Sequence, residues 1–149
     1  MVYYELQRDG ENMNLTQKRF SEYKEYVCKK MNIGEELYDL VAIDVEQYFG
    51  FYNPFVKYAG AGDSSDKNEH WTSKIVPEPY DNFIYYVHDG IYSLIENGHK
   101  NPFTICYQYN MPGFGNWKAF ADKMMFTMMR KHGLLAYIYY RAVRLFGRV

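Results

Sequence analysis

The sequence is poor in cysteine, with only Cys28 and Cys106 among its 149 residues. Two cysteines are too few for the disulfide framework of a small secreted domain, so packing must hold the fold together. Two unpaired thiols that pack as small apolar groups are the simpler interpretation, and a disulfide between them stays open. Long apolar runs are lacking as well, because no stretch approaches the roughly 20 uncharged apolar residues that a transmembrane helix needs.

An excess of charge of one sign is also missing, since 17 basic and 18 acidic side chains leave a net charge of −1. This balance argues against attraction of the whole protein to nucleic acid or to a membrane. The first residues, MVYYELQRDGENMN, contain no apolar h-region, so we expect no signal peptide. We therefore expect synthesis in the reducing cytoplasm, and later release by lysis or association with a virion stays open.

Acidic side chains are absent after Asp122, and that tail is basic: Lys123, Arg130, Lys131, Arg141, Arg144 and Arg148. These residues could attract the anionic headgroups of a membrane surface, with about 1 kcal/mol for each basic residue. An ordinary solvated helix face explains them equally well. A membrane surface bound peripherally therefore stays open as a partner of this tail, and the oligomeric state is unknown.

Apolar residues recur at helical spacing along most of the chain, which predicts helices over residues 15–31, 35–49, 80–97, 116–132 and 134–146. The segments between them, residues 50–79 and 99–115, are rich in glycine, proline and small polar residues and are expected to be loops, the second with a short strand or hairpin at most. The predicted fold class is mainly α. We expect a single domain over residues 1–149, in which residues 1–50 form a helical extension and residues 51–149 the core.

Local signals mark the ends of these helices. Asn14 or Thr16 is expected to cap the first helix. Gly34 and Gly50 bracket the second, and Gly133 is expected to end the helix of residues 116–132.

Two titratable side chains, His88 and Asp89, lie inside the otherwise apolar segment YDNFIYYVHDGIYSL. On a helix, His88 and Tyr92 share a face one turn apart, whereas Asp89 is rotated by about 100° from His88. The histidine could then act on a substrate while the aspartate faces a neighbouring loop. A buried structural histidine beside a surface aspartate is the alternative when this segment is considered alone.

The long loop that precedes this segment contains Tyr58-Ala59-Gly60-Ala61-Gly62. Alternating glycines let main-chain carbonyls approach a bound ion, and calcium accepts roughly six to eight oxygen ligands. Carbonyl oxygens alone carry little charge, and Asp89 is placed to add a carboxylate. A plain flexible loop is the alternative for this segment considered alone.

The ordered combination of Y-x-G-x-G, the helix with H-D-x-x-Y (His88, Asp89, Tyr92) and a later A-D pair (Ala121, Asp122) resembles the phospholipase A2 family. The cysteine-poor viral type found in parvovirus capsid proteins is the most similar. The C-terminal stretch also resembles small phage and bacterial proteins of unknown role that carry their own H-D-x-x-Y. The resemblance covers roughly residues 58–146.

The resemblance implies a mainly helical phospholipase A2-like domain with two antiparallel catalytic helices and a Ca²⁺ cofactor. His88 would be the general base that activates water, Asp122 would orient its ring, and Tyr92 would support Asp122. The implied calcium ligands are Asp89 and the main-chain carbonyls of Tyr58, Gly60 and Gly62. The implied activity is Ca²⁺-dependent hydrolysis of the sn-2 ester of glycerophospholipids, that is, lipid degradation.

A non-catalytic protein of viral or phage type that keeps this fold for binding or assembly is the rival hypothesis. Ala61 stands where the viral loop commonly has proline. The later helix of the family carries A-D-x-x-F, and Phe126 comes one position after the place of that phenylalanine. The other histidines, His70, His99 and His132, show no metal-ligand spacing and are expected at the surface.

Overall fold

A computed structural model describes residues 2–58, 81–97, 117–135 and 138, with side chains from residue 10 onward. This part of the chain is mainly helical and contains no strand, so the expected fold class is confirmed. The short strand or hairpin was expected within residues 99–115, which lie outside the described residues. The elements are α1 (Val2–Met31), α2 (Glu35–Asp44), the π-helical segment η1 (Val45–Phe49), α4 (Asn82–Asn97) and α6 (Trp117–Arg130).

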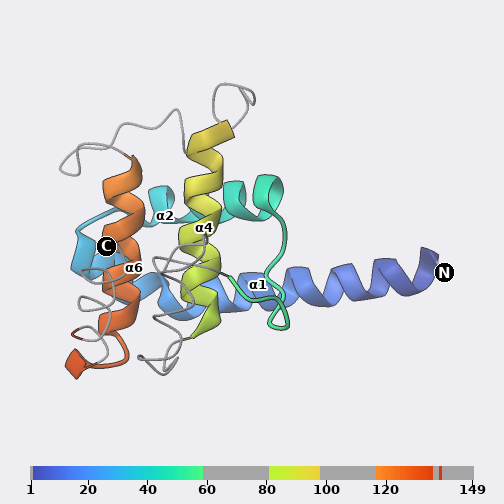
Figure 1. Cartoon of the computed structure of the whole chain (residues 1–149), viewed down its shortest axis with the longest axis horizontal. Coiled ribbons are helices and arrows are strands. Elements are labelled where there is room, and N and C mark those ends of the chain that lie inside the picture. Colours follow the sequence, from blue (N-terminus) through green and yellow to red (C-terminus); the bar gives the residue numbers. More distant parts are fainter. Residues whose placement is uncertain (1, 59–80, 98–116, 136–137, 139–149) are drawn as a thin grey trace, which may run out of the picture.

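Helices α4 and α6 lie side by side and antiparallel, and they form the largest helix–helix interface of the described chain (Figure 1). Helix α1 crosses this pair at a steep angle and packs against α6, while its N-terminal part projects away from the other helices (Figure 1). No helix in the described segments has both the length and the apolar character needed to cross a bilayer. The antiparallel pair brings residues of α4 opposite residues of α6 that are far away in sequence.

Helix α1 begins well before the expected start at residue 15, so the prediction that Asn14 or Thr16 caps it was wrong. Thr16 lies inside the helix, where its hydroxyl donates a hydrogen bond of 2.6 Å to the carbonyl of Asn12 one turn earlier. The same hydroxyl accepts a hydrogen bond of 2.8 Å from the N–H of Tyr52. A threonine, a residue type that favours helix starts, therefore links the helix interior to a distant loop.

The hydrophobic core is shared by α1, α2, η1, α4 and α6. The apolar residues that recur at helical spacing along the second half of α1 are buried in it, namely Phe20, Tyr23, Val27 and Met31. The second half of α1 thus belongs to the same core as the helices that carry the site. The methionines of α6 are also buried there: Met124, Met125, Met128 and Met129.

The predicted end of α6 is confirmed. Gly133 has a φ of 123°, a conformation that favours glycine, and its N–H donates a hydrogen bond of 3.0 Å to the carbonyl of Arg130. The helix expected over residues 134–146 lies mostly outside the described residues. Cys28 is half-buried with a free thiol, and Cys106 lies outside the described residues.

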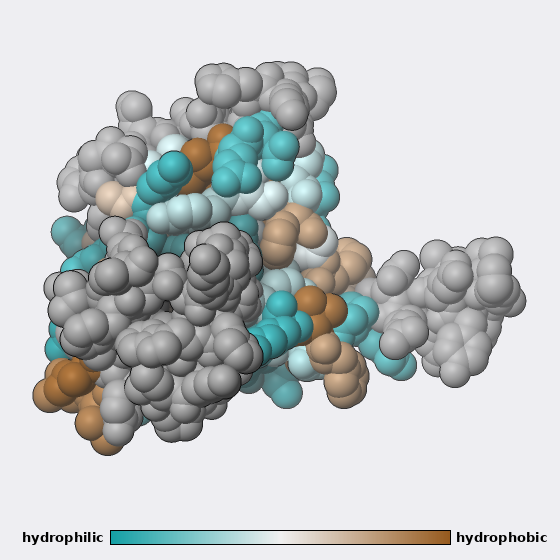
Figure 2. Space-filling view, in the orientation of Figure 1, coloured by the Kyte–Doolittle hydropathy of each residue, from teal (hydrophilic) through white to brown (hydrophobic). Residues whose placement is uncertain are grey.

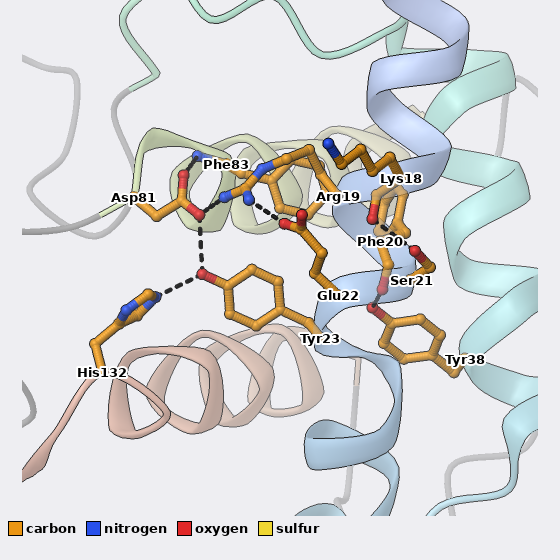
Figure 3. A network of polar contacts seen from close by, with 10 residues as sticks. All are labelled: Lys18, Arg19, Phe20, Ser21, Glu22, Tyr23, Tyr38, Asp81, Phe83 and His132. Atoms are coloured by element: carbon orange, nitrogen blue, oxygen red, sulfur yellow. Dashed lines mark hydrogen bonds and ion pairs between the residues drawn. The ribbon is translucent and has the colours of Figure 1, made fainter.

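A polar network joins α1 to the start of α4 and the end of α6 (Figure 3). Asp81 accepts hydrogen bonds from the Phe83 N–H (3.1 Å) and the Tyr23 hydroxyl (2.9 Å), and it forms an ion pair with Arg19. Burial raises the pKa of Tyr23 to about 12, so its hydroxyl keeps its proton for Asp81. The Tyr23 oxygen then accepts the hydrogen bond of 2.6 Å from His132 Nε2. These contacts fix the N-terminal end of α4 and the C-terminal end of α6 against α1.

Candidate functional site

The antiparallel packing of α4 and α6 brings His88, Tyr92 and Asp122 together. His88 Nε2 lies 2.8 Å from Asp122 Oδ1, and the Tyr92 hydroxyl donates a hydrogen bond of 2.9 Å to the same oxygen. The rings of His88 and Tyr92 also pack against each other, with centroids 4.4 Å apart. One helix turn of α4 thus supplies two groups that hold the Asp122 carboxylate.

Each of these side chains has its place for a local reason. His88 follows the buried Val87 on the core-facing side of α4 and is itself only 5% exposed. Asp122 follows the buried Ala121 on α6 and keeps 16% of its side-chain surface exposed. The carboxylate therefore lies at the edge of the helix interface, where the imidazole reaches it from inside.

The charge state of His88 reflects two opposing effects. Burial lowers the pKa of His88, but the carboxylates of Asp122 and Asp89 favour the protonated ring, and together they raise the pKa above its ordinary value. In the neutral ring, Nε2 carries the proton and donates a hydrogen bond to Asp122, because an ionised carboxylate can only accept one. Nδ1 is then left with its lone pair, as a general base requires.

The second ring nitrogen of His88 is a buried acceptor. Within the described part of the chain, His88 Nδ1 has no hydrogen-bond partner. Asp89 Oδ1 lies 3.8 Å from it, which is too long for a direct hydrogen bond but close enough for electrostatic attraction. A buried polar atom without a partner costs about 1–3 kcal/mol, so this nitrogen suits a site that a water or substrate group occupies.

The chain that leads into the candidate calcium loop is held firmly against α4. The Asn82 side chain donates a hydrogen bond of 2.7 Å to the Val56 carbonyl, and its oxygen lies 3.4 Å from the N–H of Tyr58. The ring of Tyr58 packs edge-on against Tyr86, one turn before Asp89, at a centroid distance of 5.3 Å. Burial raises the pKa of Tyr58, and the negative charge of Asp89 adds to this rise.

Of the expected calcium ligands, the structure describes Asp89 on α4 and Tyr58 in the loop before it, and the Asp89 charge is close enough to help raise the pKa of the Tyr58 hydroxyl. Gly60 and Gly62 lie outside the described residues. The described segments contain no group of three or more His, Cys, Asp or Glu side chains suited to a metal ion. The expected site is of another kind, because it uses one carboxylate and main-chain carbonyls.

Some contributors to the site were missed at the sequence level. Asn82 carries no motif, and only the structure shows that it fixes the loop that ends at Tyr58. Gly90 lies so close to η1 that an added Cβ would be 2.8 Å from Val45 Cγ1. A glycine directly after H-D in an amphipathic helix was the one available signal, since glycine in a helix interior usually has a packing reason.

Comparisons with protein-family models, with curated proteins and with solved structures find no match to this chain.

Proposed function

We propose that this protein is a Ca²⁺-dependent, phospholipase A2-like acyl hydrolase that cleaves the sn-2 ester of glycerophospholipids. The observation that carries the proposal is the state of the His88 ring. Its Nε2 is held at 2.8 Å by Asp122, and its buried Nδ1 is left for a reactant beside Asp89.

In this proposal, His88 Nδ1 accepts a proton from the attacking water. Asp122 stabilises the imidazolium that forms and keeps the ring in the tautomer whose Nδ1 is free. Tyr92 holds Asp122 through its hydroxyl, so the carboxylate cannot rotate away from His88. The raised pKa of His88 makes its ring a stronger base than an isolated histidine.

The residues that would hold the calcium ion are Asp89 and the main-chain carbonyls of Tyr58, Gly60 and Gly62. When bound, the ion supplies positive charge that polarises the ester carbonyl and stabilises the oxyanion. The unpartnered Nδ1 beside the Asp89 carboxylate fits such a site, because a water there would lie next to both groups.

The decisive experiment measures hydrolysis of a glycerophospholipid with calcium and with a chelator, for the wild type and for His88→Gln. We expect the wild type to release the sn-2 fatty acid only with calcium. We expect His88→Gln to lose about 10²–10⁴-fold in rate, the usual contribution of a general base. His132→Gln is the matched control, because it changes a histidine outside the site and should keep the activity.

Asp89→Asn separates metal binding from proton transfer, since it removes the carboxylate charge and leaves the His88–Asp122 pair in place. The calcium concentration needed for activity should rise in this variant. Activity that ignores both the chelator and the His88 substitution would refute the mechanism. Binding of lipid and calcium by the wild type without any hydrolysis would favour the non-catalytic rival.

A further inference from the structure

The segment just before Tyr58 displays apolar side chains to solvent. Phe55 is 91% exposed, Val56 is 44% exposed and Phe51 is 36% exposed. Figure 2 shows hydrophobic surface over the loop of residues 51–58, beside the point where α1 passes. Scattered single apolar residues are ordinary on a protein surface, but three in one short loop form a patch.

This patch is held in a rigid turn. Asn53 accepts the Val56 N–H on its carbonyl at 3.1 Å and the Phe55 N–H on its side-chain oxygen at 2.9 Å. Pro54 occupies the second position of this turn, where its fixed φ is favourable. Asn82 then ties the Val56 carbonyl to the first turn of α4. The Asn53 N–H also donates a hydrogen bond of 3.3 Å to the Tyr58 hydroxyl, so polar contacts on both sides of the turn hold a phenylalanine ring in water.

We infer that the turn of residues 53–56 is a membrane anchor, which inserts Phe55 and Val56 into the interfacial region of a phospholipid surface and places the site above it. This inference rests on the proposed function, because a hydrolase of membrane lipids must meet its substrate at that surface. A rigid apolar tip loses little conformational entropy on insertion, which favours binding.

The position and the charge of the turn fit this partner. Asn82 lies six residues before His88 on α4, which is about 9 Å along a helix. No acidic residue lies between Gly50 and Tyr58, and Lys57 beside the apolar tip is exposed. A lysine at this place can remain among lipid phosphates while the neighbouring apolar groups enter the acyl region.

The test measures vesicle binding in a His88→Gln background, so that binding is read without catalysis. Vesicles of phosphatidylcholine, alone and mixed with phosphatidylglycerol, are sedimented with the protein. We expect the additional change Phe55→Ser to weaken binding about tenfold or more, because it removes a large apolar group from the membrane. Ile43→Ser is the matched control, since Ile43 is 47% exposed on α2, and it should leave binding unchanged.

Equal binding with and without Phe55→Ser, or no binding to either vesicle, would overturn the inference. Self-association that Phe55→Ser abolishes, without vesicle binding, would assign the turn to a second copy of the chain instead. Hydrolysis of a short-chain phospholipid dissolved as monomers tests the proposed function separately, because this substrate needs no membrane binding. The protein with Phe55→Ser as its single change should hydrolyse this lipid at the wild-type rate if only the anchor is lost. A wild type that does not hydrolyse it would refute the proposed chemistry and leave the vesicle-binding result unaffected.

Discussion

Replacing Gly90 with alanine is expected to destabilise the protein, because η1 leaves no room for a methyl group at this position of α4. The new Cβ would lie 2.8 Å from Val45 Cγ1 and 3.2 Å from Phe49 Cδ2. Carbon atoms pack best at about 3.5–4.0 Å, and the branched Val45 side chain has little rotamer freedom to move away. Overpacking costs about 1–3 kcal/mol, and the better helix propensity of alanine offsets about 1 kcal/mol of it. The expected net loss of unfolding free energy is about 1 kcal/mol.

A double-mutant cycle with Val45→Ala tests the contact itself. Val45 is fully buried, so Val45→Ala alone should cost about 2 kcal/mol through the space it leaves. Together with Gly90→Ala, the added methyl group enters that space, and the double variant should be more stable than the sum by about 1–2 kcal/mol. Chemical denaturation of the four proteins gives the coupling free energy.

The control for helix propensity is Gly10→Ala on α1. An added Cβ there meets no heavy atom within 4 Å, so this variant should be more stable by up to about 1 kcal/mol.

Additive effects of the Gly90 and Val45 substitutions, within about 0.5 kcal/mol, would refute a tight contact between η1 and α4.

Three further predictions follow from the polar contacts. Asp122→Asn should lower the pKa of His88, because the Asp122 carboxylate favours the protonated ring; an NMR titration of the imidazole measures this, and an unchanged pKa would contradict it. Asn82→Ala should speed hydrogen exchange of the Tyr58 amide by about five- to tenfold, because it removes the hydrogen bond from this N–H to the Asn82 side chain, which is worth about 1 kcal/mol. Unaltered exchange would mean that Asn82 does not hold the loop. Burial and neighbouring positive charges lower the pKa of His132, so its contribution to stability is complete above about pH 6.5 and is lost as the pH falls through its folded-state pKa. Denaturation at several pH values should show that the wild type loses stability relative to His132→Gln as the solution is acidified, and the opposite trend would contradict the reasoning.

Local sequence patterns were enough to predict most helices of the described chain. The apolar spacing in α2 and η1, and in α4, follows the helical period, and each apolar face is buried in the structure. Gly133 ends α6 as predicted, because the backbone there takes a conformation that glycine adopts without strain. The helical period and the glycine at the helix end depend on neighbouring residues only, so the sequence contains their whole cause.

The start of α1 was predicted wrongly for a physical reason. Thr16 is a good capping residue, but its hydroxyl binds Tyr52, which is 36 positions away in the sequence. Capping rules consider only residues close in sequence, so they do not include the contact between Thr16 and Tyr52. This contact forms only when the loop after η1 packs against α1. The same holds for Tyr23 and His132, which are 109 positions apart and meet in the network of Figure 3.

The sequence by itself determined most of the helical segments and their apolar faces, and it identified His88 and Asp89 as neighbours on one helix. The hypothesis of a phospholipase A2-like site selected Asp122 as the partner of His88, whereas the spacing of the residues could not. Only the tertiary structure decided that Asp122 reaches His88 Nε2 and that Nδ1 stays buried beside Asp89. Side chains 34 positions apart meet only when two helices pack, and that packing is set by the burial of all their apolar residues together.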